Sequence, residues 1–379
     1  MLLETYLYTD SWNKALDGSL DSLDTLLIVF GSAKTTNIEG ALEELSQTFT
    51  AATIIGASTA GEIYQDELYE DSLAVSVMKF QKSRFQISKC TPISAENSYA
   101  DGVAIAQDLY TEDLKAIFIL SDGLNANGSQ LTEGISSVIP SEIPVTGGLA
   151  GDDARFEQTW ILVDDKPTSG FVCAVGFYGE HIHVAHASKG GWDRLGIERI
   201  VTKSKDNILY ELDNQPALEI YKKYLGEKAD DLPATGLLFP LELRDEAGSS
   251  ESKVRTILAV NEEDQSITFA GDIPKGSHVT LMKANYNRII DGASEAAESL
   301  ELANYEDEVI LSIAISCVGR RLVLKSRVEE ELEAILDVVP PQTKQIGFYS
   351  YGEISPLASG KCDLHNQTMT LTLIWESDA

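Results

Sequence analysis

The sequence predicts a mixed α/β (α+β) fold: two domains built from repeated β-loop-α-β units, with mixed sheets and additional antiparallel strands. Two observations predict this class. A short apolar strand, a polar loop, an amphipathic helix and a second apolar strand follow one another three times along the 379 residues. Each copy then ends in a glycine-rich turn that closes on an acidic residue, and two of these turns share the pattern Ile-Gly, four residues, Gly-Glu-Ile. Repetition on this scale indicates repeated supersecondary units.

The three units set the order of the main elements. In the helix of the first unit, apolar residues recur at spacings of three and four and therefore fall on one face. A β-loop-α-β unit normally pairs its two strands in parallel through a right-handed connection. The expected first strand, helix and second strand cover residues 26–30, 38–49 and 53–55 in the first unit, 117–120, 131–138 and 145–146 in the second, and 309–316, 328–339 and 345–346 in the third.

Between the units, alternating apolar and polar residues predict short strands of the antiparallel kind. They are expected at 5–8, 73–80, 85–90, 159–163, 170–177, 181–187, 236–239, 254–260, 266–269, 278–281 and 369–375. Three further helices are expected at 207–212, 217–225 and 286–303. The domain boundary is expected between 213 and 226, which gives domains of residues 24–215 and 216–379.

The charge and composition of the chain exclude several partners. The net charge of −31 repels phosphate backbones and anionic membrane surfaces, so neither nucleic acid nor a membrane is expected as a partner. No apolar run approaches the roughly 18 residues that span a bilayer. The N-terminus lacks the basic and apolar regions of a signal peptide, so a cytoplasmic location is expected. The four cysteines lie far apart without a CxxC pair and are expected to be reduced, with no zinc site.

The three glycine-rich turns are the first candidate site. If the units form parallel sheets, these turns lie at strand carboxyl ends, where open α/β sheets bind ligands. Their acids can then bind a ligand amine. The alternative is that the glycines make tight turns and the acids cap them through local backbone hydrogen bonds. The candidate residues are Gly56, Ser58, Gly61 and Glu62 in the first turn, Gly147, Gly148 and Asp152 in the second, and Tyr351 and Glu353 in the third.

These turns do not match familiar catalytic or nucleotide-binding motifs. A nucleophile elbow needs glycine two residues after the serine, where this chain has Ala60. Neither GxGxxG with a following acid nor GxxxxGK[ST] occurs, so a standard nucleotide loop is not expected. The protein is expected not to be an enzyme, and catalysis at the same turns is kept as a third alternative.

A histidine cluster, HIHVAH at 181–186, is the second candidate site. On a strand, His181 and His183 share one face and His186 lies on the other, which does not suit a three-histidine metal site. One of them can serve as an axial haem ligand. The alternative is that they are ordinary hydrogen-bonded strand residues. Trp192, which follows two glycines, either lines a ligand or anchors the core.

Two adjacent arginines, Arg320 and Arg321, end the first strand of the third unit. Guanidinium groups at a strand end suit a carboxylate or a haem propionate, because they bind such groups in a bidentate manner. They can equally pair with the many acidic residues of the chain. Both interpretations remain open at the level of sequence.

Six stretches of the chain resemble the FIST family, whose members combine a FIST N domain with a FIST C domain. The stretches are IGASTAGEI at 55–63, TGGLAGDD at 146–153, GGWDRLG at 190–196, ISCVGRR at 315–321, GFYSYGEISP at 347–356 and LHNQTMT at 364–370. The resemblance implies a non-enzymatic sensor of small ligands, with amino acids as the proposed ligands. The family usually has cysteine where this chain has Ala57, so any role of that thiol is absent. With no residues left for an output module, the signal is expected to pass to a separate protein.

Within the family, the sequence is similar to the stand-alone NosP-type proteins. The similarity rests on HASKGGWD at 186–193, VTKS at 201–204, LYELD at 209–213 and PAL at 216–218. It implies a non-covalent b-type haem, sensing of nitric oxide and regulation of a separate histidine kinase, with His186 as the first candidate iron ligand and His183 as the second. The leading expectation is therefore a haem-binding nitric oxide sensor. The alternative is a FIST-type sensor that binds small ligands such as amino acids without haem.

Overall fold

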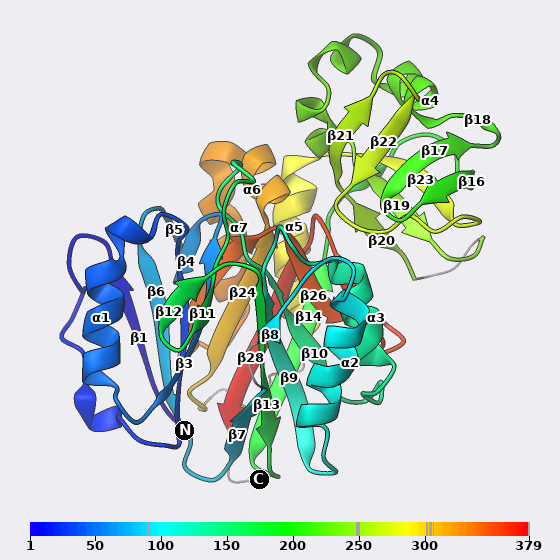
Figure 1. Cartoon of the computed structure of the whole chain (residues 1–379). Helices are drawn as coiled ribbons and strands as arrows, with labels where there is room; N and C mark the ends of the chain where they lie inside the picture. Colours follow the sequence, from blue (N-terminus) through cyan, green and yellow to red (C-terminus); the bar gives the residue numbers. More distant parts are fainter. Residues whose placement is uncertain (89–90, 248–250, 301, 303–304, 306, 378–379) are drawn as a thin grey trace.

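The computed structural model describes residues 1–88, 91–247, 251–300, 302, 305 and 307–377. Three sheets with helices on their outer sides form a body, and a fourth sheet stands apart from it at the upper right of Figure 1. Parallel and antiparallel pairs occur together in the sheets of the body. This mixture confirms the predicted fold class.

The body consists of three modules that repeat one order of elements. Module 1 contains β1 (Leu2–Tyr8), β2 (Thr25–Ser32), α1 (Glu39–Thr48), β3 (Thr53–Thr59), β4 (Glu62–Tyr64), β5 (Glu67–Tyr69) and β6 (Leu73–Lys79). Module 2 contains β7 (Arg84–Ile87), β8 (Thr91–Pro92), α2 (Ser98–Leu109), β9 (Leu114–Ser121), α3 (Gly128–Ser136), β10 (Val145–Leu149), β11 (Ile161–Val163), β12 (Lys166–Thr168) and β13 (Phe171–Tyr178). Module 3 contains β14 (Ile182–Lys189), α5 (Tyr286–Glu298), β24 (Leu311–Cys317), α6 (Val318–Leu324), α7 (Val328–Leu336), β25 (Lys344–Ser350), β26 (Gly352–Pro356), β27 (Cys362–His365) and β28 (Met369–Glu376).

The central strands of each module form the parallel pair that the sequence predicts. β2 pairs with β3, β9 with β10, and β24 with β25. The last strand of each module lies antiparallel beside the first central strand. The first strand of the module pairs with that last strand and forms the outer part of the sheet. All three modules therefore present the carboxyl ends of a parallel pair in the same structural position.

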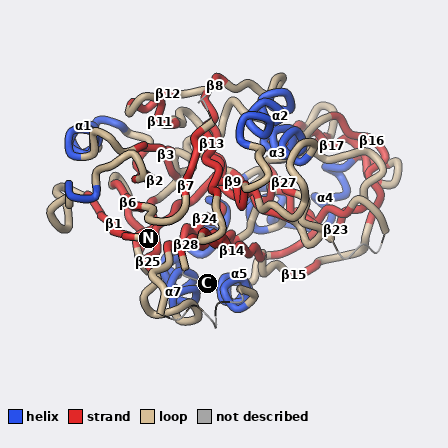
Figure 2. Tube along the Cα trace, turned by 90° about the horizontal axis from the view of Figure 1, so that it is seen from below, coloured by secondary structure: helices blue, strands red, loops and turns tan. Residues whose placement is uncertain are grey.

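After its second central strand, each module extends a hairpin into the sheet of a neighbouring module. The β4–β5 hairpin of module 1 pairs with β25, β26–β27 of module 3 pairs with β10, and β11–β12 of module 2 pairs with β3. The exchange closes the body into a ring, and in Figure 2 the labelled helices of the body, α1, α2 with α3, and α5 with α7, lie at three places around the central strands. Strands from before and after residue 215 share sheets of the body. The domain limits 24–215 and 216–379 therefore stay a prediction from the sequence.

An apolar core fills the space between the three sheets. Phe30, Phe118 and Phe348 contribute one ring from each module and are fully buried. The ring centroids of Phe30 and Phe348 are 4.6 Å apart. The outer faces of the sheets pack against α1, against α2 and α3, and against α5 and α7 (Figure 1). Burial of one phenylalanine side chain stabilises a fold by about 1.5–3 kcal/mol, so this shared core couples the three modules.

The fourth sheet is an insertion into module 3, between β14 and α5. Its strand pairs are antiparallel, and it has an apolar core of its own around Leu209, Leu218 and Phe269. The elements of the insertion are β15 (Asp193–Arg194), β16 (Arg199–Lys205), β17 (Ile208–Leu212), β18 (Gln215–Pro216), α4 (Ala217–Leu225), β19 (Leu241–Arg244), β20 (Lys253–Arg255), β21 (Ile257–Asn261), β22 (Ser266–Phe269) and β23 (His278–Lys283).

Two predicted elements of the insertion are wrong. The helix predicted at 207–212 is strand β17, because Asp206 adopts a φ of +51° and starts a tight turn that returns the chain antiparallel to β16. The strand predicted at 236–239 is part of a 3-10 helix, Ala234–Leu238. The N–H of Gly236 donates to the Pro233 carbonyl at 2.9 Å, which closes the first turn of that helix.

Other predicted elements differ in length. The strand predicted at 254–260 is divided into β20 and β21, and the helix predicted at 286–303 and the strand predicted at 85–90 are shorter than expected. Residues 89–90, 301 and 303 of those ranges lie outside the described part of the chain. Helices α2 and α6 were not predicted. The buried face of α2 is built largely from small residues, with Gly102 and Ala106 beside Ile105 and Leu109, and α6 is only seven residues long.

Candidate functional site

The three glycine-rich turns come together where the central strands end. Each turn donates one backbone N–H to a strand of a neighbouring module: Gly151 to the Ser58 carbonyl at 3.0 Å, Ala60 to the Tyr349 carbonyl at 2.8 Å and Tyr351 to the Leu149 carbonyl at 3.2 Å. The three hydrogen bonds form a ring. The turns of the sequence are therefore neighbours in space, at the carboxyl ends of the parallel strands.

Several glycines of the predicted turns lie inside strands. Gly56 belongs to β3, and Gly147 and Gly148 belong to β10. A Cβ atom would lie 2.5 Å from a carbonyl oxygen of β2 at Gly56 and 1.9 Å from one of β9 at Gly147. These glycines therefore allow the central strands to approach, whereas Gly61, with a φ of +121°, forms the turn itself. The Ser58 hydroxyl accepts the backbone N–H just before β11 at 3.0 Å.

Glu62 and Glu353 occupy equivalent, fully buried positions in modules 1 and 3. Glu62 accepts hydrogen bonds from the Thr59 hydroxyl and from the backbone N–H and hydroxyl of Ser72, the last two at 3.1 and 2.7 Å. Glu353 accepts the same set from Ser350 and from the residue before β28, at 2.7–3.1 Å. Burial raises the pKa of both carboxyl groups to about 7. These donors hold the starts of β6 and β28, which favours the capping interpretation.

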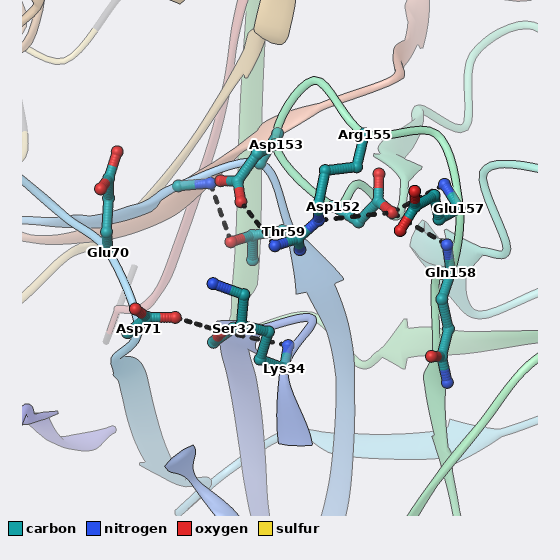
Figure 3. Close-up of polar contacts among 12 residues, drawn as sticks. Ser32, Lys34, Thr59, Glu70, Asp71, Asp152, Asp153, Arg155, Glu157 and Gln158 are labelled. Carbon is teal, nitrogen blue, oxygen red and sulfur yellow. Dashed lines mark hydrogen bonds and ion pairs between the residues drawn. The ribbon is translucent and has the colours of Figure 1, made fainter. Parts of the chain in front are cut away.

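Asp152 shapes the loop after the second turn. Its carboxylate accepts the backbone N–H groups of Phe156, Glu157 and Gln158 at 2.8–2.9 Å, and the last two lie beside it in Figure 3. The Tyr351 hydroxyl also donates to this carboxylate. The four donors hold Phe156 at a φ of +55°, a conformation that bulky residues rarely adopt. Backbone strain of this kind is concentrated at active sites and ligand clamps.

The Phe156 ring stacks on the Tyr351 ring, with centroids 4.4 Å apart and planes inclined by 16°. Two cavities between the body and the insertion meet at this pair, one of about 670 Å³ and one of about 320 Å³. Both are lined by Phe156 and Tyr351 from the body and by Leu258 and Ala270 from the insertion. We call them together the two-chamber cleft. Their volumes are those of small-molecule sites.

The larger chamber is acidic and aromatic. It lies beside the amino-terminal end of α3, and the insertion forms its opposite wall. Three acids and four aromatic residues contribute to the lining: Glu96, Asp206, Asp272, Tyr99, Phe156, Phe269 and Tyr351. The described lining contains no Lys, Arg or His. Carboxylates and aromatic faces both attract cations, so this chamber favours a positively charged group.

The smaller chamber is mostly apolar. Leu232, Ile257 and Leu322 are among its lining residues, and Asp231 is the one charged residue of the described lining. Thr256 also lines it and is only 5% exposed. Its hydroxyl has no hydrogen-bond partner in the described part of the chain. A buried hydroxyl without a partner is costly, and a ligand can supply that partner.

Polar contacts hold the insertion against the body. The Asp272 carboxylate accepts hydrogen bonds from the side-chain amides of Asn127 and Gln130, both at 3.2 Å. The fully buried Arg255 donates to the Leu364 carbonyl at 2.9 Å and to the Asp272 carbonyl at 3.2 Å. These contacts lie beside the larger chamber, so a ligand bound there touches both the body and the insertion.

The candidate haem ligands lie away from the cleft. His183 stacks on Trp375, with ring centroids 5.3 Å apart, and its Nε2 hydrogen-bonds to Ser377 at 2.8 Å. His186 lies on the other face of β14, and burial lowers its pKa. Neither lines the two-chamber cleft or the cavity of about 320 Å³ beside Trp192, whose indole N–H donates to a backbone carbonyl at 2.9 Å. Neither histidine fits an axial position beside these spaces.

Both candidate arginines have acidic partners within the protein. Arg320 is fully buried and pairs with Glu331 at 2.7 Å, which ties α6 to α7. Arg321 pairs with Glu70 and, at 3.3 Å, with Asp153; Figure 3 labels both acids. Of the two interpretations that the sequence allows, pairing with protein acids matches these contacts.

Sequence reasoning named Asp152 and Tyr351 but missed Phe156 and the residues of the insertion that face it. Phe156 is a single aromatic residue in a polar loop, where no periodicity marks it. The signal that was available is its position shortly after the acid of the second turn. Thr256 gives no such signal, because it is a single threonine between the short strands β20 and β21, in a stretch that predicts an ordinary strand.

The described residues contain neither a metal-binding cluster nor a membrane-spanning helix. No group of three or more His, Cys, Asp or Glu side chains there is arranged to hold a metal ion. Within the same residues, each helix is too short or too polar to cross a bilayer.

The fold and the site define a three-module α/β protein with an inserted domain over a cleft of small-molecule size. The model of the FIST N domain matches residues 25–215, and that of the FIST C domain matches residues 217–356. The chain belongs to the FIST family, and FIST domains are a sensory family.

Two known proteins are similar to this chain to different degrees. The uncharacterized protein MJ1623 of Methanocaldococcus jannaschii is 24% identical over 261 residues, which cover 62% of this chain and 49% of that protein. The chain thus spans about half the length of the curated relative it matches. A cyanuric acid hydrolase from A. caulinodans matches over 100% of this chain and 99% of its own, at 7% identity and a TM-score of 0.37. A likeness this weak carries no conclusion about activity.

Proposed function

We propose that the protein is a sensor that binds a small ligand in the two-chamber cleft and passes the signal to a separate protein. The observation that supports this most is Phe156, which is held at a left-handed φ and stacked on Tyr351 where the chambers meet. Membership of a sensory family supports the same class. The proposed location is the cytoplasm, and no catalytic step is assigned.

The insertion transmits the signal in this proposal. It joins the body through two short connections, after β14 and before α5, and its other contacts include the hydrogen bonds of Asp272 and Arg255. A ligand that touches Tyr351 on one side and Leu258 on the other favours one position of the insertion over others. Such a population shift changes the surface that a partner protein meets.

A haem-binding nitric oxide sensor that regulates a histidine kinase is the more specific form of this proposal, and its support is the similarity to NosP-type proteins. Haem, when bound, supplies the iron that binds nitric oxide. Because His183 and His186 lie outside the cleft, this form requires a haem site elsewhere on the chain. If the absorption spectrum shows no Soret band after the protein is reconstituted with haem, the haem proposal is refuted. If a Soret band persists in both His183→Ala and His186→Ala, neither histidine is the iron ligand. Calorimetry with amino acids tests the alternative ligand class.

The cleft itself is tested by a thermal-shift screen of the full chain against a metabolite library, followed by calorimetry on the hits. Phe156→Ala is expected to weaken the true ligand about tenfold or more, because it removes stacked area and frees Tyr351. The matched control is Tyr110→Ala, since Tyr110 is 43% exposed against 46% for Phe156 and does not line the cleft. Equal affinity in both variants places the ligand elsewhere. If the protein converts the ligand into another compound during incubation, the proposal that it is not an enzyme is wrong.

A further inference from the structure

We infer that the two-chamber cleft selects a protonated organic amine over a zwitterionic amino acid or a carboxylate. The amine occupies the larger chamber, the apolar body of the ligand occupies the smaller one, and one hydrogen-bonding group of that body reaches Thr256. This inference rests on the proposed function of the cleft as a ligand site, and it names the chemical class of the ligand.

The charges around the larger chamber favour an ammonium group. Glu96, Asp206 and Asp272 line it without a basic residue in the described lining. Among the described residues, the hydrogen bonds to the Asp272 carboxylate come from the neutral side-chain amides of Asn127 and Gln130. The buried Arg255 guanidinium attracts this carboxylate through space, whereas Glu96 and Asp206 have no ion pair with a basic side chain in the described chain. Glu96 and Asp206 are exposed and Asp272 is partly buried, so an ammonium group at the mouth of this chamber gains charge-assisted hydrogen bonds from the carboxylates and cation–π attraction from the aromatic faces.

The same surroundings disfavour a ligand carboxylate. In an amino acid the carboxylate is attached to the carbon that bears the ammonium group, so both charges enter the chamber together. The nearby guanidinium of Arg255 is fully buried and already donates to the carbonyls of Leu364 and Asp272. A buried carboxylate without a cation or free donors loses its hydration uncompensated. The acids of the chamber add repulsion to that loss.

The smaller chamber supplies an independent indication of a ligand. Thr256 is 5% exposed, lines this apolar space and has an orphaned hydroxyl within the described chain. Native proteins seldom leave a buried hydroxyl without a partner. A hydroxyl on the apolar body of the ligand satisfies it, which favours a hydroxylated amine over its plain analogue.

The test is calorimetry on the full chain with four matched probes: tyramine, phenethylamine, tyrosine and 3-phenylpropionate. Tyramine is expected to bind best, phenethylamine about threefold or more weaker and tyrosine about tenfold or more weaker than tyramine, with no binding of the acid. Tyrosine or the acid binding as tightly as tyramine overturns the inference. Failure of all four probes to bind also overturns it.

Three variants assign the effect to the named residues. Glu96→Gln with Asp206→Asn is expected to weaken both amines about tenfold without touching the contacts of Asp272, and asparagine tolerates the left-handed φ of residue 206. Thr256→Val is expected to make tyramine and phenethylamine bind alike. Unchanged affinities in these variants overturn the inference, and unchanged amine affinity in Phe156→Ala overturns the proposed cleft as well. If a zwitterion binds better than the amines and its binding is lost in Phe156→Ala, the cleft is still the ligand site and only the amine class is refuted.

Discussion

The paired buried carboxyl groups of Glu62 and Glu353 predict an unusual dependence of stability on pH. Burial raises the pKa of each from 4.5 to about 7, and a difference of about 2.5 pH units corresponds to about 3 kcal/mol per group. The folded protein therefore binds more protons than the unfolded chain between these pH values. The contribution of these two groups to the free energy of unfolding is greatest below pH 4.5 and falls, by about 6 kcal/mol for both groups together, as the pH rises through about 7.

Replacing both residues by glutamine removes this dependence. Glutamine has the shape of the protonated acid and stays neutral at every pH, and its amide can donate to Thr59 or Ser350. The double variant Glu62→Gln/Glu353→Gln is expected to be about as stable as wild type near pH 4.5 and more stable at pH 8. Urea denaturation from pH 4.5 to 8 at constant ionic strength of about 0.15 M measures both curves, because this salt screens the net charge of −31.

The matched control is Glu112→Gln, which removes one exposed carboxylate and leaves both buried groups in place. It is expected to keep the slope of the wild-type curve. If the double variant keeps that slope too, the buried carboxyls do not set the pH dependence, and the argument from their burial fails. Ligand affinity that is unaffected in the double variant supports the capping role of these residues.

Three further predictions concern stability. Glu331→Leu leaves the buried guanidinium of Arg320 without its ion partner and is expected to lower the free energy of unfolding by about 3–5 kcal/mol in urea; a loss below about 1 kcal/mol contradicts the pairing. Gly147→Ala forces a Cβ atom to within 1.9 Å of a carbonyl oxygen of β9, whereas Gly170→Ala meets open space at a φ of +75°; thermal unfolding should show a loss of about 1 kcal/mol for Gly170→Ala and a clearly larger one for Gly147→Ala. Burial by itself raises the pKa of Glu376, but backbone N–H groups and the N-terminal ammonium lower it to about 2. The Glu376 carboxylate therefore stabilises the fold above pH 4.5, and this contribution is lost as the pH falls through about 2. Glu376→Gln should make the free energy of unfolding depend less on pH in this range.

The parallel pairs of the three modules could be predicted because their strands and helices are strongly periodic. Val29, for example, lies in the continuous apolar run LLIVF at 26–30, and Ile313 lies in an apolar run at 309–315 that Ser312 interrupts. The exchange of hairpins could not be predicted. A three-residue strand such as β4 has no sequence feature that distinguishes pairing with β25, far along the chain, from pairing within its own module. Partner choice there depends on the space left between the modules.

The candidate site was predicted in part for a similar reason. The acid and the aromatic residue of two turns, Asp152 and Tyr351, are close in space because the turns meet, and the repeat made the turns visible. The insertion that covers them has no counterpart in the other modules, so the repeat says nothing about Leu258 or Thr256. The acids Glu62 and Glu353 were treated alike with Asp152, but they hold the starts of strands, whereas Asp152 holds the loop that brings Phe156 to the cleft.

The closed ring of exchanged hairpins also sets the order in which the chain can complete its structure during synthesis. The sheet of module 1 can be filled once β11 and β12 leave the ribosome, because they pair with β3. The edges of β10 and β4 must wait for β26 and β25, which are made near the end of the chain. Unpaired strand edges are templates for aggregation. A nascent chain that stalls before residue 344 therefore has unpaired strand edges in modules 1 and 2. These edges are covered only when β25 and β26 have been made and have paired with β4 and β10.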